Sequence, residues 1–169
     1  MNIISISQAN GKDAVNIAGF TNDQMKAYNT LIEFINSPYN VNDYKRALVG
    51  AAGTGKTYLV KALIKNCGLS YSTIGLAAPT HKACRVLNES IQIPNVKVNT
   101  LQSDLGLRLN FDVEKFDIDN PPFDPKGRIK IGNYQLYIVD ESSMINRSLL
   151  MFLEKTCKTY KCKIIYIGR

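Results

Sequence analysis

The sequence is organised around the stretch Ala47-Leu48-Val49-Gly50-Ala51-Ala52-Gly53-Thr54-Gly55-Lys56-Thr57. An apolar run leads there into the pattern Gly-x-x-x-x-Gly-Lys-Thr, and residues 58–64 follow it with helical character. A strand, a glycine-rich loop and a helix in this order form a phosphate-binding loop, in which backbone N–H groups and a helix N-terminus face the anion. The stretch therefore predicts a nucleotide phosphate site.

Each residue type in this loop has a physical role. We expect Gly50 and Gly55 to adopt backbone angles that a side chain would forbid, while the small residues between them let the backbone approach the phosphates closely. Lys56 is expected to reach the β- and γ-phosphates, and the Thr57 hydroxyl is expected to ligate Mg²⁺. The predicted ATP-binding set is Gly50, Ala51, Ala52, Gly53, Thr54, Gly55, Lys56 and Thr57.

A second informative stretch is the run 135–139, which is followed by the acidic residues Asp140 and Glu141. In phosphate-loop enzymes an aspartate in this place holds Mg²⁺, mostly through water, and the glutamate polarises the attacking water. Since adjacent strand residues point to opposite sides, the two carboxylates can serve different partners. We expect Asp140 to join Thr57 at the metal, and Glu141 to be catalytic together with Lys56.

Strand and helix patterns alternate along the chain from residue 20 onward. Such alternation is typical of a parallel sheet with right-handed crossovers. The expected fold class is therefore α/β, with a mostly parallel sheet of about five strands and helices on both faces. The expected strands cover 47–49, 72–78, 135–139 and 163–167, and the expected helices begin near Thr21, Lys56, Thr80 and Asn146.

Two segments lie outside this alternation. Residues 1–19 show little periodicity and are expected to form a loose arm with a short strand at Ile3–Ile6. Residues 110–133 are acidic and rich in proline, so we expect an exposed insertion that ends in a hairpin at Arg128–Ile131. Residues 20–169 are expected to form one ATP-binding domain.

Gln24 has two interpretations. Thr21 is a good N-cap, and a glutamine three residues later completes a capping box. The side-chain amide of Gln24 also offers one donor and one acceptor, which match the edge of an adenine. The local pattern by itself favours the cap.

The composition is that of a globular domain with a basic balance. The 169 residues carry a net charge of +7, with 45% hydrophobic and 21% charged residues. Basic residues gather in 41–90 and 146–169, whereas 104–124 is acidic, and a basic balance suggests a polyanionic partner. No apolar run approaches the roughly 20 residues needed to span a membrane, and the first residues do not resemble a secretory signal. We expect a cytoplasmic protein (host cytoplasm if phage-encoded) without a membrane partner.

The cysteines and the histidine do not suggest a metal site. Cys67, Cys84, Cys157 and Cys162 form no C-x-x-C pair, and His81 is the only histidine of the sequence. We therefore expect no zinc site, reduced and mostly buried thiols, and no disulfide-linked partner.

Four stretches match the pattern of one family: Gly50–Thr57, Ala77–Ala83, Thr100–Ser103 and Asp140–Met144. Together with Gln24 they resemble the first motor domain of superfamily 1B DNA helicases, of the RecD-like and Dda-type kinds, the latter known from T-even phages. The resemblance covers about residues 20–168. Its second and fourth stretches are specific, because kinases and most other phosphate-loop ATPases lack both. The resemblance implies a P-loop NTPase with a RecA-like core.

The resemblance also implies a role for each matching residue. It places Gln24 at the adenine, which reverses the local preference for a cap. It places Lys56 at the terminal phosphates, Thr57 and Asp140 at Mg²⁺, and Glu141 as the catalytic base. Pro79, Thr80 and His81 would line the single-stranded DNA track, with Thr100 nearby. Gln102 departs from the family pattern, in which histidine is frequent at this position.

The chain ends at Gly168-Arg169, before the family's third helicase motif. In relatives this motif senses the γ-phosphate, and the arginines that complete the ATP site come from later segments. We therefore expect a RecA-like core that is incomplete at its C-terminus. ATP turnover by residues 1–169 alone is expected to be close to background, because a supplied arginine is worth about 10³–10⁵ in rate at such sites.

The expected function is that of the ATP-binding portion of an ATP-dependent DNA helicase. In the full-length enzyme it would couple ATP hydrolysis to single-stranded DNA translocation and duplex unwinding. ATP and Mg²⁺ are the expected cofactors, and single-stranded DNA and other replication or recombination proteins are the expected partners. Two alternatives stay open: a non-catalytic module that binds nucleotide or single-stranded DNA, and another P-loop NTPase such as a nucleotide kinase, against which Ala77–Ala83 argues.

Overall fold

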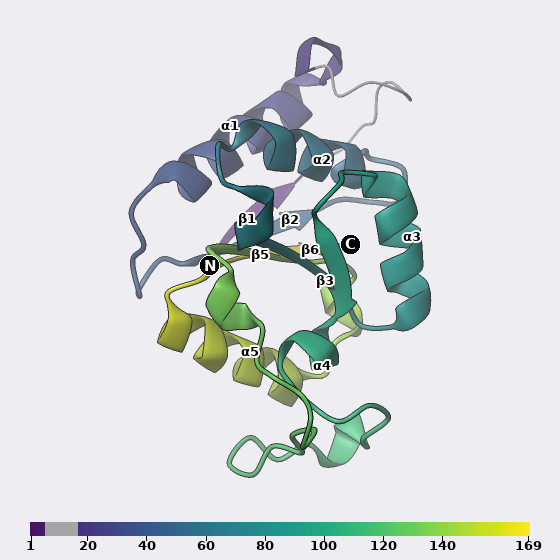
Figure 1. The fold of residues 1–169 in the computed structure, drawn as a ribbon. Helices are drawn as coiled ribbons and strands as arrows, with labels where there is room; N and C mark the ends of the chain where they lie inside the picture. Colours follow the sequence, from purple (N-terminus) through teal and green to yellow (C-terminus); the bar gives the residue numbers. More distant parts are fainter. Residues whose placement is uncertain (6–16) are drawn as a thin grey trace.

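The structure, a computed structural model, describes residues 1–5 and 17–169. Its strands form one six-stranded sheet in the order β1-β2-β6-β5-β3-β4, and neighbouring strands pair in parallel (Figure 1). The predicted α/β class with a mostly parallel sheet is confirmed, with one strand more than expected. The strands are β1 (Asn2–Ser5), β2 (Lys45–Val49), β3 (Ile74–Ala78), β4 (Lys97–Thr100), β5 (Leu136–Val139) and β6 (Lys163–Gly168).

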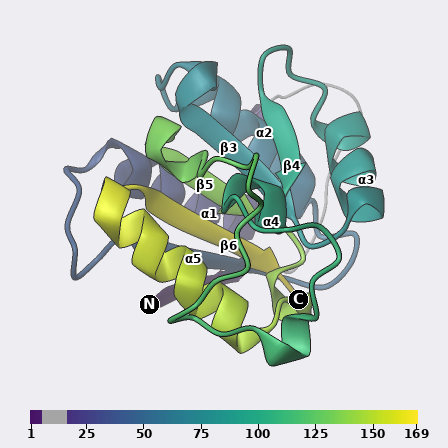
Figure 2. The same cartoon turned by 60° about the horizontal axis from the view of Figure 1, so that its bottom comes forward.

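Helices cover both faces of this sheet, as expected (Figures 1 and 2). On one face lie α1 (Asn22–Asn36), α2 (Lys56–Asn66) and α3 (His81–Ile91), and on the other lie α4 (Leu101–Asp104) and α5 (Arg147–Tyr160). Two hydrophobic clusters separate accordingly, one on each face of the sheet. Short 3-10 turns occur at Ile17–Gly19, Tyr71–Thr73, Val113–Lys115, Ile131–Asn133 and Ser142–Met144.

The central strands are apolar along their whole length because both of their faces are covered. Every residue of β3 and β5 is buried. The helices instead bury one stripe each, and α3 does so through Cys84, Leu87 and Ile91. Val86 has a spacing that fits this stripe, but it is 54% exposed, because the narrow stripe of α3 passes beside it.

Parallel strands bring their carboxyl ends to one edge of the sheet. β2 runs into the phosphate loop there, β3 into Pro79, β4 into α4 and β5 into Asp140. The phosphate loop, the segment that begins at Pro79, α4 and Asp140 therefore lie at the same edge of the sheet.

The insertion 110–133 differs from its prediction in two ways. Arg128–Ile131 forms no hairpin, and the one antiparallel bridge in this region joins Leu107 and Phe123. The segment is also not exposed throughout, because two of its aromatic side chains pack on Phe152 of α5. Phe116 and Phe123 lie with their ring centroids 5.6 Å and 6.1 Å from that of Phe152.

The N-terminal segment contributes to the sheet. The short strand expected at Ile3–Ile6 is found at Asn2–Ser5, where it pairs with β2 from Asn2 opposite Arg46 to Ser5 opposite Val49. Residues 2–5 are therefore an edge strand rather than part of a loose arm. Ile6 and the rest of the expected arm up to residue 16 lie outside the described residues.

Candidate functional site

The phosphate loop turns through two glycines with left-handed backbone angles. Gly53 and Gly55 have φ values of 78° and 79°, whereas Gly50, which we expected to need such angles, does not. Gly55 is also the N-cap of α2, so the helix begins directly at Lys56. Residues 51–53 are exposed, and their backbone is therefore open to an incoming anion. The loop has the shape that a phosphate requires.

Lys56 lies across this loop. Its Nζ donates to the carbonyl oxygens of Gly50 (2.6 Å) and Ala51 (2.8 Å). Burial lowers the pKa of Lys56, the nearby Asp140 carboxylate opposes that shift, and Arg169 adds to it. The cation is thus held between the loop and Asp140, where a phosphate oxygen would replace its carbonyl contacts.

Asp140 and Glu141 diverge because the backbone turns sharply after β5. The strand ends at Val139, and Glu141 adopts a left-handed conformation with φ of 51°. Asp140 is half-buried, and burial raises the pKa of its carboxyl, while Lys56 lowers it. Glu141 is exposed. We expected strand alternation to separate the two carboxylates, but the turn separates them.

Gln24 is fully buried and engaged at both ends of its amide. The capping box with Thr21 is confirmed: Gln24 N donates to Thr21 Oγ1 (3.2 Å), and Thr21 N donates to Gln24 Oε1 (2.9 Å). Gln24 Nε2 donates to the carbonyl of Thr54 in the phosphate loop (3.0 Å). With 0% of its surface exposed, Gln24 presents no free edge to an adenine in this conformation.

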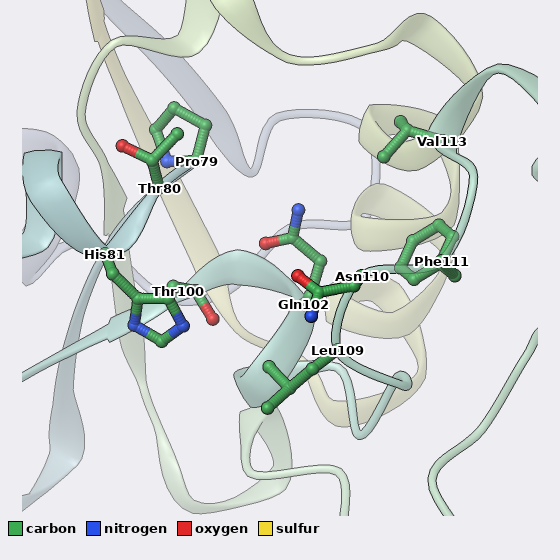
Figure 3. A pocket seen from close by; sticks show the side chains of 9 residues that line it. All are labelled: Pro79, Thr80, His81, Thr100, Gln102, Leu109, Asn110, Phe111 and Val113. Carbon is green, nitrogen blue, oxygen red and sulfur yellow. The ribbon is translucent and has the colours of Figure 1, made fainter.

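The four residues expected on the DNA track line one pocket of about 280 Å³ (Figure 3). Pro79, Thr80 and His81 come from the segment after β3, and Thr100 comes from the end of β4. Gln102, from the matched stretch Thr100–Ser103, lines the same pocket, and the structure adds residues that sequence reasoning did not include: Leu109, Asn110, Phe111 and Val113. The last four precede or begin the insertion, and no local pattern connects them with residues 79–81.

Three further findings concern the described residues as a whole. The four cysteines are buried and free, as expected. Within residues 1–5 and 17–169, no group of three or more His, Cys, Asp or Glu side chains has an arrangement suited to a metal ion. In the same part of the chain, none of the helices combines the length and the apolar character needed to cross a membrane.

Comparison with known proteins adds three findings. A family model described as AAA domain matches residues 21–169. An uncharacterized protein of Acanthamoeba polyphaga mimivirus is 30% identical over 164 residues, which cover 88% of this chain and 32% of that protein. This chain thus spans about a third of the length of that curated relative.

Among solved structures, a mutant ATPase domain of the large terminase of a Thermus phage is similar to this chain, with 14% sequence identity and a TM-score of 0.39. The match covers 82% of this chain and 68% of the terminase chain. The family match extends over nearly the whole chain and includes the phosphate loop, Asp140 and Glu141. The chain therefore belongs to the AAA domain family and is a nucleotide-binding P-loop ATPase domain.

Proposed function

We propose that this chain is the ATP-binding portion of an ATP-dependent DNA helicase, with Mg·ATP on the phosphate loop and single-stranded DNA at the pocket beyond β3 and β4. The observation that carries the proposal is a direct backbone connection between the two sites. Asp140 N donates to the carbonyl of Ala77 (2.8 Å), and the strand that contains Ala77 runs on into Pro79 at the pocket. A displacement of Asp140 on nucleotide binding would therefore be transmitted to the DNA-contacting segment.

The residues at the phosphate loop suit Mg·ATP. Lys56 would contact the terminal phosphates, Thr57 and Asp140 would hold Mg²⁺, and the exposed Glu141 would act as the base. Bound Mg²⁺ supplies charge neutralisation at the phosphates. The half-buried Asp140 carboxylate, opposed by one lysine, offers the negative charge that a hard cation prefers.

The residues at the pocket suit a nucleic acid strand that is bound without sequence preference. Lys82 and Arg85 are exposed on α3, next to the pocket residues Thr80 and His81, and would contact phosphates. Contacts to phosphates give affinity and register but do not discriminate sequences.

The nucleotide part of the proposal is tested by thermal melting with and without Mg·ATP. A ligand that binds only the folded state stabilises it by about 2.7 kcal/mol at a concentration of 100 times Kd. We expect a higher midpoint for the wild type and no rise for Lys56→Ala. An unchanged wild-type midpoint, or an equal rise in the variant, would refute it.

The DNA part is tested by fluorescence anisotropy with a labelled single strand across a salt series. For about three neutralised phosphates, log K should fall against log salt with a slope of roughly −2. We expect His81→Ala with Lys82→Ala to weaken binding. Lys158→Ala with Lys161→Ala is the matched control, because these residues lie at the C-terminal end of α5, at the other edge of the sheet. Equal losses in both double variants would indicate diffuse charge attraction instead of a defined track.

A further inference from the structure

A second pocket lies where β5 and β6 begin, at the edge of the sheet opposite the phosphate loop. Its volume is about 140 Å³, and the polar part of its lining consists of Ser37, Tyr39, Gln135, Lys161 and Lys163. We call it the lysine pocket. None of the described residues that line it is acidic, so the two ammonium groups have no carboxylate within the pocket.

Lys163 brings a buried cation to the lysine pocket. It is 6% exposed, and its Nζ donates to the carbonyl oxygens of Phe34 (2.6 Å) and Ile35 (3.1 Å). The carbonyl and the hydroxyl of Ser37 accept from the same ammonium. These groups lie at the C-terminal end of α1, where the helix dipole offers only about half a negative charge. The hydrogen bonds of the ammonium are therefore satisfied, but its charge is not fully balanced.

The neighbouring charged groups leave the same imbalance. Burial lowers the pKa of Lys163, Arg46 adds to that shift, and Asp43 opposes it. Both oxygens of Asp43 already accept from Arg46, at 2.6 Å and 3.1 Å. Lys161, at the C-terminal end of α5, is exposed beside the pocket. The three cations thus bring more positive charge to this end of α1 than the paired Asp43 offsets, which favours an incoming anion.

Tyr39 supplies the unsatisfied group of the lysine pocket. Its Oη is buried and has no hydrogen-bond partner among the described residues. Burial raises the pKa of this phenol, and the nearby thiols of Cys157 and Cys162 add to the shift, so the hydroxyl keeps its proton at neutral pH. A buried donor without an acceptor is unfavourable, and an oxygen of a ligand would supply the acceptor. The side-chain amide of the exposed Gln135 offers another donor at the same pocket.

The apolar part of the lining decides which anion fits. It consists of Ile35, Leu69 and Leu136. A phosphate group carries oxygens on all sides and would press some of them against these side chains, which is unfavourable. A carboxylate carries its oxygens at one end, so that a short hydrocarbon stem can cover the apolar side chains. The volume of about 140 Å³ is also small beside the roughly 300–1,000 Å³ of sites for larger ligands, which suits a short stem.

We infer that the lysine pocket binds an aliphatic carboxylate on a short stem, with Tyr39 Oη and Lys161 Nζ donating to its oxygens. A free dicarboxylic acid and the glutamate side chain of a protein segment both present this group. The pocket lies at the edge of the sheet away from the phosphate loop and from the proposed DNA track, so the inference does not depend on the proposed function.

The test is an NMR chemical-shift titration of the isotopically labelled full chain with two probes, glutarate and the peptide acetyl-Gly-Glu-Gly-amide. Their neutral counterparts, glutaramide and acetyl-Gly-Gln-Gly-amide, should bind much more weakly. Tyr39→Phe removes only the hydroxyl and should raise Kd by roughly 10- to 150-fold, the range for a hydrogen bond to a charged group. Lys161→Gln should raise Kd by up to about 5-fold, because Lys161 is exposed.

Two matched control variants make the same chemical changes outside the pocket. Tyr160→Phe and Lys155→Gln lie at exposed positions of α5 and should leave Kd unchanged. Thermal melting without ligand separates a binding role of Tyr39 from a structural one. Because Tyr39→Phe removes a buried donor that has no partner, its midpoint should hold or rise, although carboxylate binding falls.

The possible results also distinguish the two sources of the carboxylate. Tighter binding of glutarate than of the peptide would assign the pocket to a free acid, and tighter binding of the peptide would assign it to a protein segment. Absence of saturable shifts with both probes would overturn the inference. So would inorganic phosphate that binds as tightly as glutarate, or equal losses in the pocket and control variants. None of these outcomes bears on the binding of Mg·ATP, which is tested separately.

Discussion

Replacement of Gln24 by alanine tests whether this residue supports the phosphate loop from behind or reads a nucleobase. Its amide connects the N-terminus of α1 to the loop: Nε2 donates to the Thr54 carbonyl, and Oε1 accepts from Thr21 N. No part of the residue is exposed. If these contacts are its main role, the variant should lose stability in the absence of any nucleotide.

The size of the loss follows from the two contacts. The Thr54 carbonyl would be left without this partner at a buried position, which costs about 1–3 kcal/mol. Loss of the acceptor for Thr21 N removes half of the capping box and costs about 0.5–1 kcal/mol. The sum is roughly 2–4 kcal/mol. In a chain of this length, 1 kcal/mol shifts the midpoint by about 2–4 °C, so 3 kcal/mol lowers it by roughly 6–12 °C.

The assay is thermal melting without ligand, with Mg·ATP and with Mg·GTP. Thr21→Ala should cost only about 1 kcal/mol, because it removes the cap and keeps the Thr54 contact. Thr30→Ala, on the exposed side of α1, should stay within about 0.5 kcal/mol of the wild type. The reasoning fails if Gln24→Ala leaves the ligand-free midpoint unchanged and instead abolishes a difference between Mg·ATP and Mg·GTP.

Three further predictions concern buried groups. Burial raises the pKa of the Asp140 carboxyl, so the charged carboxylate destabilises the fold at neutral pH, and this cost vanishes as the pH falls below the ordinary pKa of an aspartate. Asp140→Asn should therefore raise the urea midpoint at pH 7 but not near pH 3. The same variant should abolish stabilisation by Mg·ATP. Gly75→Ala should cost about 1–3 kcal/mol in urea melts, because its Cβ would meet two tyrosine rings at 2.7 Å, whereas Gly19→Ala, with open space around it, should be neutral. Lys163→Met should lower the thermal midpoint by the equivalent of about 2–3 kcal/mol, because the buried ammonium donates hydrogen bonds to carbonyls at the C-terminal end of α1. An unchanged midpoint would mean that water satisfies those carbonyls equally well.

Much of the fold was predictable because its determinants are local. The glycine spacing of the phosphate loop, the caps at Thr21, Thr80 and Asn146, and the apolar periodicity of the helices all act over a few residues. The same holds for the strand before Asp140, which is recognisable as an apolar run that ends in two carboxylates. Such patterns depend on backbone geometry and short-range hydrogen bonds, which can be inferred from the residues of a single segment.

Within the candidate site, the sequence identified the residue types but not all of their contacts. It assigned the loop, Lys56 and the two carboxylates to one region, and the structure places Lys56 near Asp140. It did not show that Gly53 rather than Gly50 takes the left-handed angle, because the motif allows more than one way of closing the loop. The position of Glu141 was likewise set by a turn that the adjacent strand pattern does not encode.

Contacts between residues far apart in the chain could not be read from local patterns and became visible only in the folded molecule. The Gln24 amide meets Thr54 across 30 positions, and the Tyr137 hydroxyl meets Asp104 across 33. The pocket likewise joins Phe111 to His81. The local pattern gave Gln24 as a cap, Thr54 as a residue of the phosphate loop and Phe111 only as part of the insertion 110–133. Their roles were decided by which side chains the packed sheet and helices bring within hydrogen-bond or van der Waals distance, and local periodicity carries no information about those distances.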